Sequence, residues 1–138
     1  ETARRAGIAW LVAQIDGLIA NGALVWESIL AAQELAKKGI RARVINVHTV
    51  KPFDFATVTA AARECGAIVT AEEHSIIGGL GSAVAEVLAE GCPDPMMRVG
   101  IRDVFCPTGR NLDTLMDACG LSVAEIVNAV KQTIQRKK

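Results

Sequence analysis

Several residue types are scarce in this chain, and each scarcity narrows what the protein can be. The 138 residues include no tyrosine and two histidines, and fifteen basic residues balance fifteen acidic ones. This even balance argues against a surface that binds nucleic acid or an anionic membrane. The longest apolar run, Ile8 to Ala13, is too short for a membrane span, which needs roughly 18–20 residues.

The cysteines do not have the spacing of a zinc site. The four residues form no C-x-x-C pair and have no histidine cluster nearby, so a structural zinc ion is not expected. Cys65 falls on the apolar face of a predicted helix, where it is expected to pack as a small hydrophobe. Free thiols in a reducing cytoplasm fit this pattern, and no secretory signal is visible, so we expect a cytoplasmic protein.

Strand and helix patterns alternate from Ile15 onward, which predicts βαβ units and a mostly parallel sheet in one domain. Strands are predicted at 18–20, 42–47, 67–71 and 97–101, and a short helix at 112–119. Four longer helices are each marked by an apolar stripe: Val25, Ile29, Ala32 and Ala36; Val58, Ala61, Ala62 and Cys65; Val84, Val87 and Leu88; and Ile126, Val127, Val130 and Ile134.

Local signals place several helix ends. Asp54 is a plausible N-cap, and Gly66 marks the end of the helix that follows it. Ser122 and Glu125 have the spacing of a capping box at the start of the last helix. Residues 1–14 leave alternatives open: Asp16-Gly17 between two apolar runs is a hairpin signal, yet the stretch could equally be a helix or a linker.

A glycine-rich turn, Gly78-Gly79-Leu80-Gly81-Ser82, lies between a predicted strand and a helix. Backbone N–H groups at such a helix start can hold an anion. The pattern is neither G-x-G-x-x-G nor a P-loop, so it carries little specificity for nucleotides. The alternative is structural, since glycine permits a tight turn and close helix–sheet packing.

Charged residues gather where the predicted strands end. Glu72, Glu73 and His74 follow the third strand, and His48 follows the second, so both histidines are expected at one edge of the sheet. His74 beside carboxylates could act as an acid, a base or a contact group, but no nucleophile has partner spacing. A hydrogen-bonding or interface role for Glu73 and His74 is the plainer interpretation.

Lys51-Pro52-Phe53-Asp54 forms a corner after the second strand. Pro52 favours an extended residue before it and starts the turn. Lys51 could bind phosphate or could be exposed at an interface. Trp26 falls off its helix's apolar stripe, which predicts that Trp26, together with Phe53, belongs to a surface that meets another subunit or domain.

In this order, the segments resemble the C-terminal domain of transketolase and of related thiamine-diphosphate enzymes. The resemblance covers roughly residues 18–135. It is carried by these segments: Ile19-Ala-Asn-Gly22, Leu30 to Ile40, Val44-Ile-Asn-Val-His-Thr-Val-Lys-Pro-Phe-Asp54, Val69-Thr-Ala-Glu-Glu-His74, Gly78-Gly-Leu-Gly-Ser82 and Gly120-Leu-Ser122. It implies a three-layer α/β/α domain over residues 15–138, with a five-stranded mixed, mostly parallel sheet that has one antiparallel strand. Residues 1–14 would be a connecting segment.

The resemblance also implies a division of labour within a larger enzyme. Transketolase moves two-carbon ketol units between sugar phosphates with thiamine diphosphate and Mg²⁺, which lie between its pyrophosphate-binding and pyrimidine-binding domains. The family's G-D-G metal signature and cofactor-activating glutamate have no counterpart here, and Phe105 to Gly109 departs from the common loop pattern. We therefore expect no catalytic, cofactor or metal residue in this domain, and a role in assembly.

Related members of the family remain alternatives: 1-deoxyxylulose-5-phosphate synthase and the β subunits of 2-oxoacid dehydrogenases. Expected partners are the other two domains, in a homodimer or an α₂β₂ assembly, without nucleic acid or membrane. A different class, a small module that binds an anionic ligand, would use the following residues: Gly78, Gly79, Gly81, Ser82, His74, His48, Glu73 and Lys51.

Overall fold

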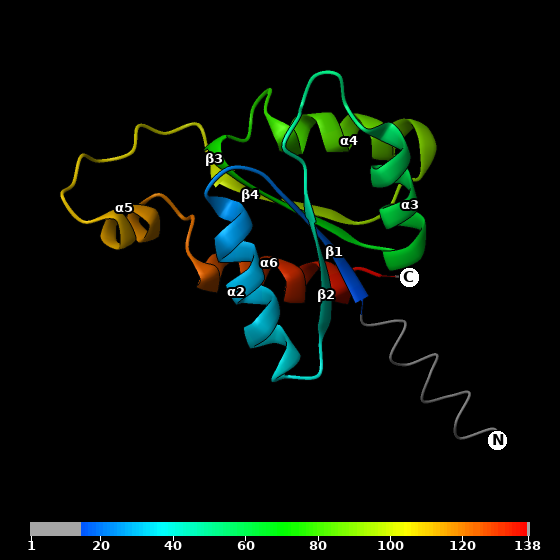
Figure 1. Ribbon diagram of the computed structural model, residues 1–138, viewed down its shortest axis with the longest axis horizontal. Helices are drawn as coiled ribbons and strands as arrows, with labels where there is room; N and C mark the ends of the chain where they lie inside the picture. Colours follow the sequence, from blue (N-terminus) through cyan, green and yellow to red (C-terminus); the bar gives the residue numbers. More distant parts are fainter. Residues whose placement is uncertain (1–14, 138) are drawn as a thin grey trace.

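The computed structural model describes residues 15–137, and the expectations for residues 1–14 lie outside it. Four strands form one parallel sheet in the order β2-β1-β3-β4 (Figure 1). The strands are β1 (Ile15–Ala20), β2 (Arg41–Asn46), β3 (Ile68–Ser75) and β4 (Met96–Ile101). The helices are α2 (Leu24–Ala36), α3 (Phe55–Cys65), α4 (Leu80–Gly91), α5 (Leu112–Ala118) and α6 (Val123–Gln135).

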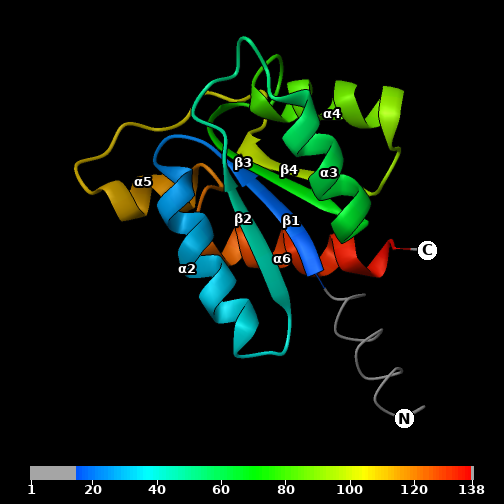
Figure 2. The ribbon, with the colours of Figure 1, turned by 45° about the vertical axis from the view of Figure 1, so that its right-hand side comes forward.

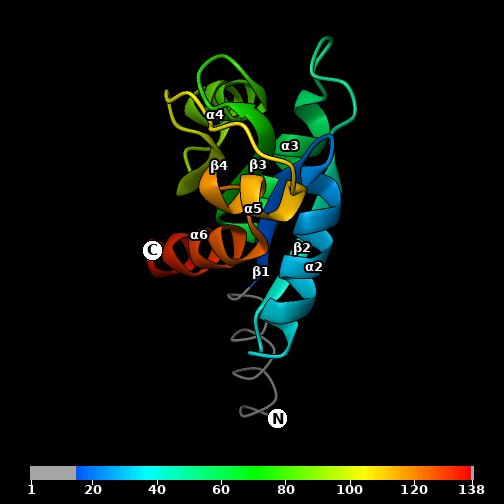
Figure 3. The ribbon, with the colours of Figure 1, turned by 90° about the vertical axis from the view of Figure 1, so that its left-hand side faces the viewer.

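The predicted three-layer α/β/α architecture is confirmed. Two hydrophobic cores flank the sheet, one shared by α2 and α6 and the other by α3 and α4, and Figure 3 shows the two helix pairs on opposite sides of the strands. The strand count differs from the prediction, because residues 15–137 contain four strands, all parallel, rather than five with one antiparallel. After β4 the chain contains Pro107 and Gly109 and runs outward to α5 without pairing with the sheet (Figure 2).

The order of the strands creates a switch point at the centre of the sheet. From β1 the chain moves outward to β2, then crosses to β3 and moves outward in the opposite direction to β4. In open parallel sheets of this kind, a crevice forms at the carboxyl ends of the two strands where the direction reverses. Here those strands are β1 and β3.

Asp16-Gly17 is not a hairpin turn, because both residues lie inside β1. The Gly17 N–H donates to the carbonyl of Ala67, and a Cβ on Gly17 would lie 2.5 Å from the Ile68 side chain. Glycine is therefore needed at this position for close packing between neighbouring strands.

The helix predictions were right about position and partly wrong about faces. The α3 stripe is confirmed, and Asp54 caps α3 by accepting the Thr57 N–H at 3.0 Å. The predicted α2 stripe is wrong by one residue, since the residues that face the core are Leu24, Ser28, Ala31 and Leu35. Ser122 is the N-cap of α6, but it makes no side-chain capping bond, so the predicted capping box is not formed.

The third strand is longer than predicted and carries Glu72, Glu73 and His74 within it. β1 pairs with β3 only as far as Ala71, whereas β4 pairs with it again at Ser75 after an irregularity. Pairing with β4 therefore extends β3 beyond Ala71, the last residue of β3 that pairs with β1.

The expectation of four free thiols is also corrected. Cys106 and Cys119 form a disulfide, because the excursion between β4 and α6 brings their Cα atoms to 5.7 Å, within the range that a disulfide can bridge. Cys65 is buried as predicted, and both Cys65 and Cys92 are free. In residues 15–137 no helix has the length and apolar character to cross a membrane.

Candidate functional site

The central feature of the candidate site is the buried carboxylate of Glu72, which caps α4. Its two oxygens accept the Leu80 and Gly81 N–H groups, each at 2.8 Å. Glu72 is only 1% exposed, so this charge is compensated by two backbone donors and by the positive end of the helix dipole. The sequence predicted Glu72 at the sheet edge, but it did not predict that Glu72 caps α4.

Glu73 reaches the opposite face of the sheet. Its Oε1 accepts the Ala23 N–H at 3.4 Å, next to the start of α2. Gly22 makes room for it, since Gly22 has φ +57° and a Cβ there would lie 2.8 Å from that oxygen. Successive side chains of a strand point to opposite faces, so the two adjacent glutamates reach the starts of two helices on the two sides of the sheet.

The glycine-rich turn is closed by its own hydrogen bonds. The Gly78 N–H donates to Ser82 Oγ at 2.9 Å, and that hydroxyl donates to the Ile76 carbonyl at 2.9 Å. A Cβ on Gly81 would lie 2.8 Å from Arg98 Cδ. With Leu80 and Gly81 bonded to Glu72, an anion at this turn would have to displace the protein's own carboxylate.

The two histidines end at the same edge of the sheet but have different surroundings. His74 Nδ1 lies 2.8 Å from the Ser75 carbonyl, which can only accept, so Nδ1 carries a hydrogen. The same nitrogen lies 3.9 Å from Glu72 Oε2. His48 contacts Thr49 Oγ1 at 2.6 Å on the connection after β2.

A cavity of about 420 Å³ opens at the switch point between β1 and β3. Its lining includes four of the predicted site residues, Glu73, His74, Gly78 and Gly79, together with Asn21, Gly22, Val50, Glu72 and Leu80. His48, Lys51, Gly81 and Ser82 do not line it. Asn21 and Gly22 were missed as site residues, although their place directly after a central strand was a usable signal.

The described residues do not fit thiamine diphosphate with its metal ion. No group of three metal-ligating side chains occurs among them. Glu72 is only 1% exposed and both of its oxygens hold the start of α4, so this carboxylate is not presented to a bound cofactor. No catalytic step is assigned to these residues.

A second polar cluster lies at the opposite, amino edge of the sheet. Asp16 is fully buried, and among residues 15–137 its carboxylate oxygens have no hydrogen-bond partner. Burial raises the pKa of Asp16 from 3.8 to about 7, although the charge of Lys137 works against this shift. Burial also raises the pKa of the Cys65 thiol and lowers the pKa of Lys137.

Comparison with known proteins gives consistent results for sequence and structure. The family model for the C-terminal domain of transketolase matches residues 17–126. A 6-deoxy-6-sulfo-D-fructose transketolase subunit of Clostridium sp. (strain MSTE9) is 52% identical over 120 residues, covering 87% of this chain and 37% of that subunit. A 1-deoxy-D-xylulose-5-phosphate synthase of Geobacter sulfurreducens is 45% identical over 113 residues, covering 78% of this chain and 18% of that enzyme.

A solved structure, a split gene transketolase described as an inactive β4 tetramer, superposes with a TM-score of 0.84 at 41% identity. The superposition covers 91% of this chain and 41% of that one, so this chain spans well under half the length of the relatives it matches. The family match extends over most of the chain and includes the switch point, the glycine-rich turn and Glu72. The chain therefore belongs to the transketolase C-terminal domain family.

Proposed function

We propose that this chain serves as the C-terminal domain of a transketolase that transfers two-carbon ketol units between sugar phosphates. The match to transketolase subunits over most of the chain carries the proposal. The chain would work with pyrimidine-binding and pyrophosphate-binding domains in a cytoplasmic homodimer or α₂β₂ enzyme of the pentose phosphate pathway, and it would be inactive alone.

The geometry of the sheet edge supports a role in assembly rather than in chemistry. The two glutamates at this edge contact helix starts: Glu72 caps α4 and Glu73 contacts the start of α2. In contrast, Trp26 is 61% exposed, which supports the prediction that it meets another polypeptide. Phe53 is partly buried against the α3–α4 core, and its ring neighbour Phe55 is the exposed one.

A reconstitution experiment tests this proposal. The chain is titrated with thiamine diphosphate and Mg²⁺, and ketol transfer is assayed with and without added pyrimidine-binding and pyrophosphate-binding domains. We expect no saturable cofactor binding and no transfer by the chain alone, and transfer in the assembled enzyme. Tight cofactor binding, or transfer without partners, would contradict the proposal.

A second candidate within the family is 1-deoxyxylulose-5-phosphate synthase, which the 45% identity to such an enzyme favours. The β subunit of a 2-oxoacid dehydrogenase is the third. The pyrimidine-binding domain differs among these enzymes, so the sequence encoded immediately upstream of Glu1 separates them. Assaying the assembled enzyme with the substrates of each type provides the functional check.

The anionic-ligand module stays a prediction with less support. The Leu80 and Gly81 N–H groups, which would have held the anion, are bonded to Glu72. Titration with phosphate and sulfate, followed through the backbone amide resonances of 78–82, tests it. A dissociation constant below about 1 mM, worth roughly 4 kcal/mol, would favour this module over a purely structural turn.

A further inference from the structure

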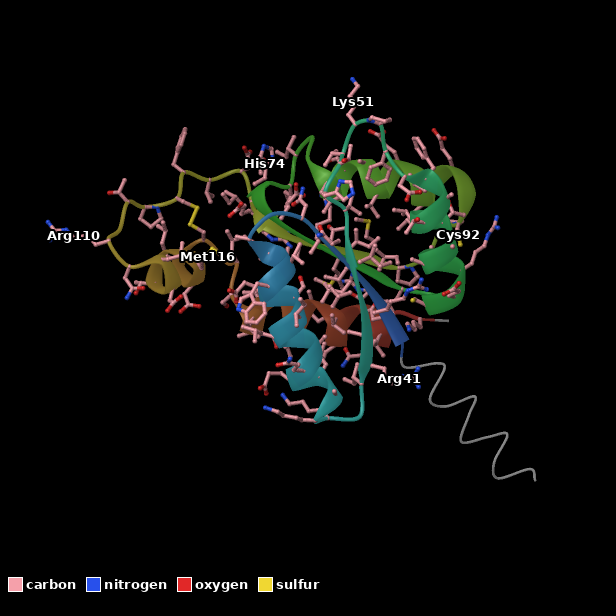
Figure 4. The ribbon with its side chains drawn as sticks, in the orientation of Figure 1. Arg41, Lys51, His74, Cys92, Arg110 and Met116 are labelled. Carbon is pink, nitrogen blue, oxygen red and sulfur yellow. A yellow bond between two sulfur atoms is a disulfide. The ribbon has the colours of Figure 1, made fainter. Side chains whose placement is uncertain are left out.

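The segment between β4 and α6 has few contacts that hold it to the fold. Among residues 102–114, every residue is exposed except Cys106. No backbone hydrogen bond joins residues 103–110 to another part of the described chain. Figure 4 shows Arg110 at the outer end of this segment, directed away from the sheet. The outer part of the segment is therefore held by something other than packing or backbone pairing.

The Cys106–Cys119 disulfide supplies that attachment. It links the middle of the exposed stretch to the end of α5, across a sequence separation of 13 residues, and Figure 4 shows it as a yellow bond within the segment. Both cysteines are partly exposed, so a reductant in solution can reach the sulfur atoms. Within residues 15–137, the arrangement of 103–110 thus depends on one accessible covalent bond.

The two ends of this disulfide are anchored differently. Cys119 packs partly against the α2–α6 core, and its N–H donates to the Leu115 carbonyl at 3.0 Å. The buried Leu121 follows two residues later, and its N–H donates to the Met116 carbonyl at 2.8 Å. Cys106 has no comparable anchor. If the disulfide opens, Cys119 is held in place and Cys106 is released.

α5 itself cannot keep the segment in place. It has seven residues, and none of them is buried. A helix of two turns is marginal in water without tertiary packing or a cross-link. The segment also carries three exposed hydrophobic side chains, Val104, Phe105 and Leu112, and Phe105 directly precedes Cys106. The disulfide therefore determines whether these side chains have one fixed arrangement or many.

We propose that Cys106 and Cys119 form a reversible, redox-sensitive disulfide that controls the order of residues 103–114. In the oxidised chain the segment is fixed, and a dithiol reductant releases it while the sheet and the four longer helices stay folded. Disulfides in cytosolic proteins are usually transient and either catalytic or redox-sensing. The inference rests on the cytoplasmic location within the proposed function, and it adds a regulated segment to that domain.

The chemistry of opening is thiol–disulfide exchange. One thiolate of the dithiol attacks a sulfur of the Cys106–Cys119 bond and forms a mixed disulfide, and the second thiolate then displaces the cysteine. The bond between the cysteines breaks, a disulfide forms within the reductant, and two electrons and two protons end on the two cysteine thiols. Glutathione disulfide drives the reverse reaction and leaves as two glutathione thiols.

Hydrogen exchange in the two redox states tests the proposal. The chain is treated with dithiothreitol without denaturant, and its thiols are counted after an acid quench and unfolding. The count should rise from the two free cysteines to four. We expect amide exchange in 103–114 to become at least about tenfold faster, while exchange in the central strands is unchanged. Adding glutathione disulfide should restore both the thiol count and the slow exchange.

Limited proteolysis provides an independent readout. Trypsin cleaves after Arg110, which is exposed within the loop closed by the disulfide. Cleavage by a protease follows the population of locally opened chain, so we expect cleavage at Arg110 to be at least about threefold faster after reduction. Lys38, exposed in the turn after α2, is the internal control. Cleavage there should be the same in both redox states.

Matched variants identify the cysteines responsible. Cys106→Ser/Cys119→Ser should show fast exchange in 103–114 and no response to dithiothreitol, whereas Cys92→Ser should respond like wild type because Cys92 is free. Equal exchange in the two redox states, or a disulfide that dithiothreitol opens only in denaturant, would overturn the proposal. So would loss of protection in the central strands, since the disulfide would then support the whole fold. None of these readouts depends on ketol transfer, so a failure here is distinct from a failure of the proposed function.

Discussion

Gly79 lies so close to Glu72 that a Cβ on Gly79 would sit 2.0 Å from Glu72 Oε2. The same added atom would lie 3.0 Å from His74 Nδ1. The glycine-rich turn is therefore explained by the protein's own buried carboxylate. Glycine at this position lets the chain pass over Glu72 and aim the first N–H groups of α4 at it, a geometry that any side chain would obstruct.

Replacing Gly79 with alanine tests this explanation. The added methyl would force Glu72 to move or the turn to shift, and we expect the free energy of unfolding to fall by roughly 1–3 kcal/mol. Urea denaturation provides the measurement. Gly91→Ala is the control, because nothing lies within 4 Å of the Cβ site at the end of α4, and it should be neutral or slightly stabilising. Equal losses in the two variants would contradict the explanation.

Removal of the Glu72 carboxylate should be more costly. Glu72→Ala leaves the Leu80 and Gly81 N–H groups without their acceptor in a buried place, and we expect a loss of about 2–4 kcal/mol. Glu72→Gln keeps one acceptor oxygen, so its loss should be intermediate. Because Glu73 is exposed, Glu73→Gln should change the free energy of unfolding by less than about 0.5 kcal/mol. If Glu73→Gln cost as much as Glu72→Ala, the role assigned to Glu72 would be wrong.

Local signals in the sequence predicted the local parts of the fold. The Asp54 cap and the Gly66 end of α3 each depend on residues within one helical turn, and both were predicted correctly. The α2 stripe was displaced because Val25 and Ile29 are as apolar as the residues that face the core. Ser28, which is fully buried, could not be recognised as a core residue from its polarity.

Features that depend on distant contacts could not be predicted in the same way. The extra length of β3 comes from its pairing with β4 at Ser75, and no pattern near Glu72 indicates that pairing. The disulfide depends on how the 102–111 segment folds back on α5. For the site, the sequence placed Glu73 and His74 at the correct edge, but the capping of α4 by Glu72 required the three-dimensional turn.

The Cys106–Cys119 disulfide should stabilise the segment between β4 and α6, which contains α5. None of the residues in α5 is buried, so this segment has little hydrophobic packing to hold it. In the Cys106→Ser/Cys119→Ser variant, we expect the free energy of local opening to fall by up to about 3 kcal/mol, seen as faster hydrogen exchange in α5 and unchanged exchange in the central strands. Cys92→Ser is the control, since Cys92 is free. Four titratable thiols in the unreduced protein would contradict the cross-link.

Burial of Asp16 predicts a specific dependence of stability on pH. Its pKa is about 7 in the folded chain against an ordinary value of 3.8, so below about pH 4 both states are protonated and burial of the ionised group costs nothing. Between pH 4 and 7 the unfolded chain ionises while the folded chain keeps its proton. Stability therefore falls with rising pH, by up to about 4 kcal/mol in total, and levels off above pH 7.

Asp16→Asn cannot ionise, so its stability should lack this fall and should exceed that of wild type by roughly 1–3 kcal/mol at pH 8. Urea unfolding of both proteins from pH 4 to 8 provides the measurement, and parallel curves would show that Asp16 does not hold its proton in the folded chain.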